Sequence, residues 1–359
     1  MKNTFKQGPN LGLAGIAAIV CFSFVGTGCQ KDNTTVPGGS TKTYDEVKLV
    51  ADESSSGAAQ TDPNLKNPWG IAISSSGTFW VSANGTGTST IYDNTGASVL
   101  TAISIPAPGS LMGKPTGIVA NTTSDFTLPV TGEVSKFIFS TENGSIAAWS
   151  SAGAAVTVAD RSESGAMYKG LAIANDGTAN FIYAADFKNG KIDVFDHSFA
   201  YVTTGKPFTD SSMPSGFAPF NIRNVDGMLY VTYAKQGADG DEVNGAGNGY
   251  IDVYKPDGTM VSRFATQGSL NSPWGIAMAP ETFGFGQKAI LVSNFGDGHI
   301  NAFAQDGTSL GELKDSSNNA VSINGLWDIA FPSSDSDQLY FTAGGSDETH
   351  GLFGYLKIH

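Results

Sequence analysis

The chain has 359 residues, of which 40% are hydrophobic and 15% are charged, and its formal net charge is −13. So acidic a surface would repel a phosphate backbone, and we therefore expect no nucleic acid among the partners. The 45 glycines and the many Ser, Thr, Asn and Asp residues mark turns between short runs rich in Val, Ile, Phe, Tyr and Trp. Because no stretch has a sustained helical period, this composition predicts an all-β fold.

The first 28 residues have the pattern of a lipoprotein signal peptide. Lys2 and Lys6 precede a mostly apolar stretch, Leu11 to Val25, that has the length of a signal-peptide core and is short for a membrane span. The stretch runs into VGTGC, which is similar to a lipobox, so we expect a lipid on Cys29. The expected location is the cell envelope of a Gram-negative bacterium, anchored to the outer membrane and open to surface exposure. An ordinary secretory signal is the alternative.

Residues 29–43 are polar and contain Pro and Gly, which predicts a flexible tether between the lipid and the domain. Contact with the membrane would then be made only through the lipid. Cys21 lies inside the predicted signal, so a mature chain would retain only Cys29. Neither disulfides nor thiol chemistry is expected in the folded part.

One sequence pattern recurs six times along the remainder of the chain. A turn with Pro, Trp or Gly leads into a short apolar strand, an aromatic-rich strand follows, and a polar loop precedes a strand of the type IDVFD. Repeats of about 50 residues with this strand content are typical of four-stranded propeller blades, and a solenoid is the less favoured architecture. The sequence therefore predicts a six-bladed β-propeller, with the copies aligned at Gly70, Gly117, Gly170, Asn221, Gly275 and Asp328.

The sixth copy supplies only three strands before the chain reaches His359. The segment 44–50, YDEVKLV, alternates polar and apolar residues and precedes the first copy. We expect it to supply the missing outer strand, which would close the ring and cover a sheet edge. Residues 44–359 should then form one domain.

The leading turns NPWGIA and SPWGIA resemble those of NHL-repeat propellers. Together with blocks such as YKGLAIA, GKIDVFD and GNGYIDVY, they are similar to an uncharacterised family of bacterial secreted or anchored propellers, over roughly residues 44–356. That resemblance implies the fold and no particular activity. A more distant likeness to the gluconolactonase and regucalcin propellers implies a divalent metal in the central tunnel, although a shared fold does not fix a function.

In each blade, the loop that leads into the inner strand and the loop after the second strand should open on the same face. We expect a binding site there, at one mouth of the tunnel. The alternative is that these residues serve hairpin geometry and packing between blades. The candidate binding residues are Trp69, Asn84, Glu142, Lys169, Asp186, Phe220, Lys235, Trp274, Asn294 and His350.

Clustered carboxylate and amide oxygens suit Ca²⁺, the one cofactor that the sequence suggests. Its candidate ligands are Glu142, Asp186, Asp239, Asp241 and Asn294. The favoured function is a module that binds a small molecule, a glycan or a protein through its loop-rich tunnel face, and the sequence leaves catalysis open. The alternatives are a metal-dependent lactonase- or esterase-like hydrolase in the tunnel and a structural protein of the envelope.

Overall fold

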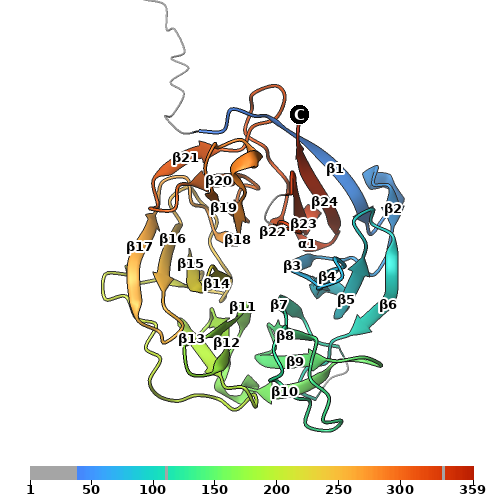
Figure 1. Ribbon diagram of the computed structural model, residues 1–359, viewed down its shortest axis with the longest axis vertical. Coiled ribbons are helices and arrows are strands. Elements are labelled where there is room, and N and C mark those ends of the chain that lie inside the picture. Colours follow the sequence, from blue (N-terminus) through green and yellow to red (C-terminus); the bar gives the residue numbers. More distant parts are fainter. Residues whose placement is uncertain (1–38, 110–111, 334–335) are drawn as a thin grey trace, which may run out of the picture. The chain divides into compact units, whose positions relative to one another are not determined.

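Strands of six sheets are arranged around a central axis in the computed structural model, which describes residues 39–109, 112–333 and 336–359 (Figure 1). The predicted signal peptide, Cys29 and most of the predicted tether lie outside these residues. Within the described part of the chain, no helix is long and apolar enough to cross a membrane. The all-β, six-bladed propeller predicted from the repeats is confirmed.

The strands follow one another blade by blade in chain order. Blade 1 contains β3 (Pro68–Ile73), β4 (Phe79–Ala83), β5 (Thr88–Tyr92) and β6 (Ser98–Ser104), and blade 2 contains β7 (Pro115–Ala120), β8 (Phe137–Thr141), β9 (Ser145–Trp149) and β10 (Val156–Asp160). Blade 3 contains β11 (Tyr168–Asn175), β12 (Asn180–Asp186) and β13 (Lys191–Phe195), and blade 4 contains β14 (Phe217–Val225), β15 (Met228–Lys235), β16 (Gly249–Tyr254) and β17 (Met260–Thr266). Blade 5 contains β18 (Pro273–Ala279), β19 (Ala289–Asn294), β20 (Ile300–Phe303) and β21 (Ser309–Glu312).

The closing blade joins both ends of the described chain. From the axis outward it contains β22 (Leu326–Ala330), β23 (Gln338–Ala343), β24 (Leu352–Ile358) and β1 (Tyr44–Ala51), and β2 (Gln60–Thr61) adds a short parallel strand outside them. Strand β1 pairs antiparallel with β24, from Tyr44 opposite Ile358 to Ala51 opposite Leu352. The predicted closure by an N-terminal strand is therefore confirmed.

Blade 3 departs from the expected four strands. After β13 the outer pairing is reduced to an isolated bridge between Phe195 and Tyr201. The next residues, VTTGKPF, contain Gly205 and Pro207. Since proline has no backbone N–H to donate, a longer ladder is disfavoured at this point.

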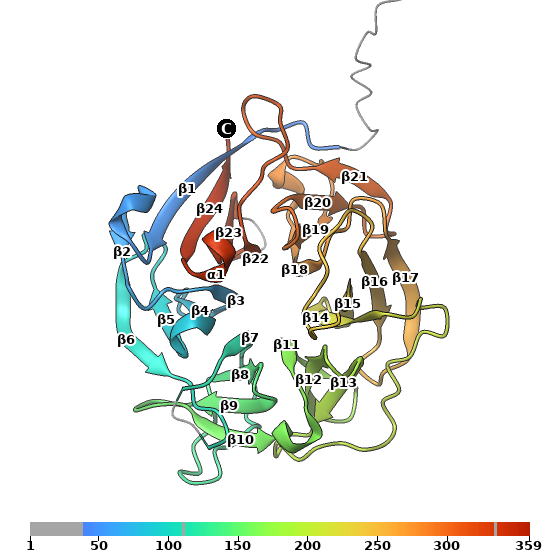
Figure 2. The same cartoon turned by 180° about the vertical axis from the view of Figure 1, so that it is seen from behind.

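The helical segments are short and lie in loops. Four 3₁₀ turns are present in the described residues, and the α-helical turn α1 (Gly345–Glu348) follows β23. Figure 2 shows the ring from the side on which α1 lies in front. This side carries the loops that lead into the inner strands, and we call it the loop face.

The six aligned positions form a ring of contacts between neighbouring inner strands. A Cβ on Gly117 would overlap the backbone of Leu171, and one on Gly170 would overlap Asn221, so glycine permits the close approach. At two positions a polar side chain spans the gap instead. Asn221 Nδ2 donates to the carbonyl of Trp274 over 2.8 Å, and Asp328 Oδ2 accepts the N–H of Ile71 over 2.8 Å.

The hydrophobic core lies between blades. Phe79 of blade 1 stacks on Tyr340 of the closing blade with ring centroids 4.1 Å apart, and Trp80 stacks on Phe137 of blade 2 at 3.9 Å. Each blade is thus stabilised by its neighbours, and the ring holds the inner strands in fixed positions around the tunnel.

Candidate functional site

The two sets of loops predicted to share a face do so through backbone hydrogen bonds within each blade. The N–H of Asn84 donates to the carbonyl of Asn67 over 3.0 Å in blade 1, and that of Glu142 donates to Lys114 over 3.0 Å in blade 2. Equivalent bonds join Phe187 to Met167 and Phe295 to Ser272. Each second loop is therefore held beside the turn that leads into its own inner strand.

Aromatic rings close the tunnel at the loop face. We call Trp69, Trp274, Trp327 and Phe220 the aromatic plug; all four are at most 1% exposed. Trp69 stacks on Trp327 with ring centroids 3.5 Å apart, and Trp69 meets Trp274 edge-on at 6.0 Å. Blades 1 and 5 are not neighbours, so this last contact lies across the axis. The three predicted binding aromatics therefore all pack against Trp327, and such packing is the alternative that the sequence left open.

Lys169 is buried next to the plug. Its side chain is 3% exposed, and its Nζ lies 4.9 Å from the ring centroid of Trp69. Nζ also lies 2.7 Å from Glu142 Oε1 and 3.2 Å from Asp241 Oδ1. Asn84 Nδ2 donates to the other oxygen of Glu142 over 3.0 Å. The structure thus brings together four predicted polar site residues, one from each of blades 1 to 4: Asn84, Glu142, Lys169 and Asp241.

Two further carboxyl groups interact with Lys169, and we call the set of Lys169, Glu142, Asp241, Glu242 and Glu348 the Lys169 cluster. Burial raises the pKa of Glu142, but the ammonium of Lys169, the hydrogen bond from Asn84 and the charge of Lys114 together hold that pKa below its usual value. Burial likewise raises the pKa of Glu242, whose Oε2 has no hydrogen-bond partner in the described part of the chain. Burial and then the charge of Glu242 raise the pKa of Glu348 to about 7. The pKa of Glu348 is thus raised into the neutral range.

A cavity of about 600 Å³ adjoins the Lys169 cluster on the loop face, and we call it the polar groove. Asn67 Nδ2 donates to Glu348 Oε2 over 3.2 Å, while Asn67 Oδ1 accepts the indole N–H of Trp327 over 3.1 Å. Ser346, Asp347 and Glu348 all have positive φ, an uncommon conformation for residues with a side chain. The groove is lined by Asn67, Asn84, Gly85, Met112, Gly113, Lys114, Asn143, Asp347 and Glu348.

The other predicted site residues lie outside the Lys169 cluster. Asp186 accepts the N–H of Met167 and the side-chain amide of Asn189, and Asn294 donates to the carbonyl of Ser269. Lys235 is exposed at the end of β15. His350 Nδ1 lies 3.0 Å from Asp52 Oδ2 in the closing blade.

The candidate calcium ligands do not converge. The ammonium of Lys169 contacts both Glu142 and Asp241, Asp239 accepts from the backbone of Asp241, and Asp186 and Asn294 are engaged as above. Among the described residues, no group of three or more His, Cys, Asp or Glu side chains is arranged to hold a metal ion. These residues, as placed, do not fit Ca²⁺, and we derive no chemistry from a metal.

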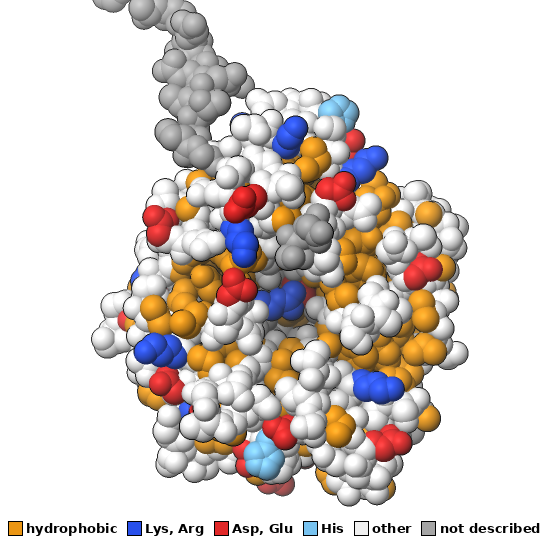
Figure 3. All heavy atoms as spheres, in the orientation of Figure 1, with side chains coloured by type: hydrophobic (Ala, Val, Ile, Leu, Met, Phe, Trp, Pro, Cys, Tyr) orange, Lys and Arg blue, Asp and Glu red, His pale blue; other side chains and the backbone are white. Residues whose placement is uncertain are grey.

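A second cavity, of about 460 Å³, opens at the opposite mouth of the tunnel and was not predicted from the sequence. Figure 3 shows it as a hollow at the centre of that face, with a basic side chain inside and hydrophobic side chains around it. Its lining includes Arg223 of β14. The aligned repeats could have indicated this cavity, because one copy has a cation where the others have a small apolar residue. The residues two positions after the aligned position are Ala72, Val119, Ala172, Arg223, Ala277 and Ala330.

Comparison with known proteins places the chain among viral relatives. No family model matches it. Two uncharacterized proteins of Acanthamoeba polyphaga mimivirus are each 35% identical to the chain, over 325 residues (87% of the chain and 80% of the relative) and over 313 residues (83% and 82%).

Solved structures share the fold at low identity. A streptogramin B lyase superposes with a TM-score of 0.52 and 13% identity, over 88% of this chain and 97% of its own. An α-L-arabinofuranosidase of Fusarium graminearum superposes with a TM-score of 0.54 and 10% identity, with the same two coverages. At such identities these neighbours support the propeller fold and carry no argument about activity.

The expected location in a Gram-negative cell envelope is wrong. The expectation rested on the short N-terminal pattern and on a resemblance to bacterial propellers, whereas the relatives found over most of the chain are viral and point to a viral origin. The predicted signal and the lipid on Cys29 lie outside the described residues. The chain belongs to the same family as the two mimivirus proteins, and its structure gives that family a six-bladed β-propeller fold.

Proposed function

We propose that this protein is a binding module whose polar groove takes a small hydroxyl-rich molecule, such as a mono- or disaccharide unit of a glycan. The groove is lined by the amides of Asn67, Asn84 and Asn143 and by the carboxyl of Glu348. Amide and carboxyl groups donate and accept hydrogen bonds, as hydroxyl groups also do. A cavity of about 600 Å³ has the size of a small-molecule site.

This proposal rests on the hydrogen bonds that hold the side chains of the groove in place. Asn84 is bonded to Glu142, and Glu142 is held by the buried ammonium of Lys169. Asn67 is bonded both to the indole of Trp327 and to Glu348. A ligand therefore meets side chains that are already ordered, which lowers the entropic cost of binding.

Binding to a panel of neutral mono- and disaccharides, measured by saturation-transfer NMR and then by calorimetry, tests the proposal. Glu348→Ala should weaken the best binder at least tenfold, because it removes a carboxyl group from the wall of the groove. The matched control is Glu163→Gln, a change at an exposed acid in another loop of the same face. No binder in the panel, or equal binding by Glu348→Ala, would contradict the proposal.

A second candidate is acid–base hydrolysis of a lactone or ester at the same groove, and the pKa of Glu348 favours it. A carboxyl group with a pKa of about 7 can donate or accept a proton at neutral pH. Hydrolysis of a panel of lactones and esters should then fall about 100-fold or more in Glu348→Gln. An unchanged rate in that variant would exclude Glu348 as the acid or base.

A further inference from the structure

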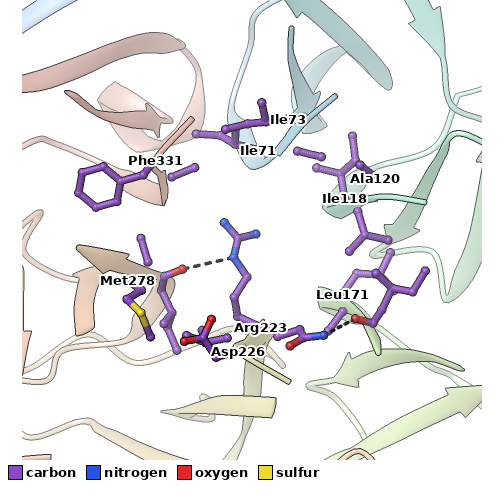
Figure 4. A pocket seen from close by; sticks show the side chains of 18 of the residues that line it. Ile71, Ile73, Ile118, Ala120, Leu171, Arg223, Asp226, Met278 and Phe331 are labelled. Carbon is purple, nitrogen blue, oxygen red and sulfur yellow. Dashed lines mark hydrogen bonds between the residues drawn. The ribbon is translucent and has the colours of Figure 1, made fainter. Parts of the chain in front are cut away.

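The cavity at the mouth opposite the loop face is separate from the polar groove. Residues from the inner strands of all six blades line it. Figure 4 shows apolar side chains around its wall, among them Ile73 and Ile118 on one side and Met278 and Phe331 on the other. A volume of about 460 Å³ is within the range of small-ligand sites, and this wall would favour an apolar body.

Arg223 is the only Lys or Arg among the described residues that line this cavity, and Figure 4 shows its guanidinium pointing into the middle. Nε donates to the carbonyl of Ile276 in blade 5 over 3.2 Å. Nη2 donates to the carbonyl of Ile329 over 3.3 Å and to Asp328 Oδ1 over 3.4 Å. The side chain thus extends from blade 4 past blade 5 to the closing blade, and three contacts fix its position.

The remaining nitrogen of this guanidinium is available to a ligand. Nη1 has no hydrogen-bond partner within the part of the chain that the structure describes, and the side chain is only 22% exposed. Asp328 is fully buried, and burial raises the pKa of its carboxyl, while its two oxygens also accept the N–H groups of Ile71 and Ile329. The pair with Asp328 therefore leaves one edge of the guanidinium unpaired, and a planar acceptor fits that edge.

A second negative group would be disfavoured at this site. Asp226 lines the cavity from the exposed turn after β14 and repels additional negative charge. Most of the residues that line the cavity are apolar, and Arg223, Asn224, Asp226 and Ser333 add polar groups to its wall. The recognised chemistry is thus one anionic group attached to an apolar body.

We propose that this cavity binds a small monocarboxylic acid with an aliphatic or aromatic body, with its carboxylate on Nη1 of Arg223 and its body against the apolar wall. Charge-assisted hydrogen bonds to a guanidinium are strong, and the burial of the body adds to them. The site does not depend on the polar groove, because it shares no residue with it.

Isothermal titration with octanoate tests this site, with 1-octanol as the uncharged probe of equal length and inorganic phosphate as the anion without a body. Octanoate should bind at a ratio of one to one, at least tenfold more tightly than either of the others. Comparable binding of 1-octanol or of phosphate would overturn the proposal.

Variants locate the binding. Removing Arg223 alone would leave Asp328 buried without its cation, so the informative variant is the double change Arg223→Met with Asp328→Asn, after its folding is checked by circular dichroism. It should bind octanoate at least tenfold more weakly and 1-octanol about as well as the original chain does. If it does not fold, Arg223→Lys, which keeps the charge and loses the planar fork, should still weaken octanoate at least threefold.

A change in the wall provides the second test. Ala120→Phe should reduce the binding of both octanoate and 1-octanol, because its ring would fill the cavity while Arg223 stays in place. The exposed change Glu163→Gln on the other face should leave octanoate binding unchanged. Full octanoate affinity in Ala120→Phe, or in the Arg223 variants, would place the binding elsewhere and contradict the proposal.

Discussion

The two mouths of the tunnel differ although the same six inner strands form both. One residue before the aligned position, the strands carry Trp69, Thr116, Lys169, Phe220, Trp274 and Trp327, and three residues later they carry Ala72, Val119, Ala172, Arg223, Ala277 and Ala330. The rings of the first set meet across the axis and close the tunnel, whereas the small side chains of the second set leave it open. Three residues of a strand span roughly 10 Å. Over that short distance the tunnel changes from a packed aromatic core to a cavity with one cation.

Opening the closed mouth should have the largest effect on stability. Trp327→Ala removes a fully buried ring that stacks on Trp69 and Phe295, and we expect the free energy of unfolding to fall by about 4 kcal/mol. Urea unfolding followed by circular dichroism measures this change. Val130→Ala, at a side chain that is 89% exposed, is the control. A loss below about 1 kcal/mol would mean that the rings do not act as a core.

Removing the buried cation of Lys169 beside the aromatic plug should lower the free energy of unfolding by a somewhat smaller amount. Lys169→Met leaves Glu142 buried without its partner, and we expect a loss of about 3 kcal/mol in the free energy of unfolding. Adding Glu142→Gln should recover much of that loss, because no unpaired charge then remains. If the double variant is no more stable than the single one, the cost does not arise from the Lys169–Glu142 pair.

Between the two mouths, the aligned positions that carry glycine should not tolerate a side chain. Gly117→Ala places a methyl group against the backbone of Leu171, and we expect a loss of about 2 kcal/mol from overpacking. Gly345→Ala is the matched control, since the nearest atom to its added Cβ is at 3.9 Å. Equal melting temperatures of the two variants would contradict the close approach of the inner strands.

The ionisation of Glu348 on the loop face should have the smallest effect on the free energy of unfolding. The native chain keeps the proton of Glu348 up to a pH of about 7, while the unfolded chain loses it near 4.5. The proton therefore favours the native state at low pH, and its contribution is lost as the pH rises from about 4.5 to 7. Since Glu348 is partly exposed, we expect a decrease of about 1 kcal/mol in unfolding free energy over this range.

The matched variant for this titration is Glu348→Gln, which cannot ionise. Its stability should change less than that of the original chain between pH 4.5 and 7, and above pH 7 it should be the more stable of the two by a similar amount. Urea unfolding at several pH values provides the comparison. Parallel pH profiles for the two proteins would show that Glu348 titrates at its ordinary pKa.

The architecture was predictable because the repeat is local and regular. The alignment at Gly70, Gly117 and Gly170 follows from short motifs, and it marks the ring where neighbouring inner strands touch. The closing strand β1 was predictable from its alternation and from the three strands of the last copy. Blade 3 was less regular than expected, since the residues after β13 break the outer ladder.

The sites were less predictable because they depend on which side chains meet across blades. Asn84, Glu142, Lys169 and Asp241 were selected as loop residues, and the structure brings them together, but their charges pair with one another and do not form a metal site. Asp186 and Asn294 follow strands in the same way, yet each bonds within its own blade and its leading turn. No local sequence motif distinguishes the loop residues that meet across blades from those that bond within one blade.

Arg223 differs from these residues because it lies inside a strand, where polar loop motifs give no indication of it. The alignment of the six copies does, since it places Arg223 where the others have Ala or Val. In a repeat protein, a residue that departs from the repeat at an inner-strand position is a stronger indication of a binding site than a polar residue in a turn. Turn residues have an alternative explanation in hairpin geometry.

The difference between the two mouths is tested most directly by an NMR titration with octanoate of protein labelled at the isoleucine methyl groups and at the tryptophan indoles. We expect the methyl signals of Ile73 and Ile118 to shift, while the indole N–H signals of Trp69, Trp274 and Trp327 stay in place. Indole signals that shift while those methyl signals do not would place the open mouth at the loop face, opposite to the structure.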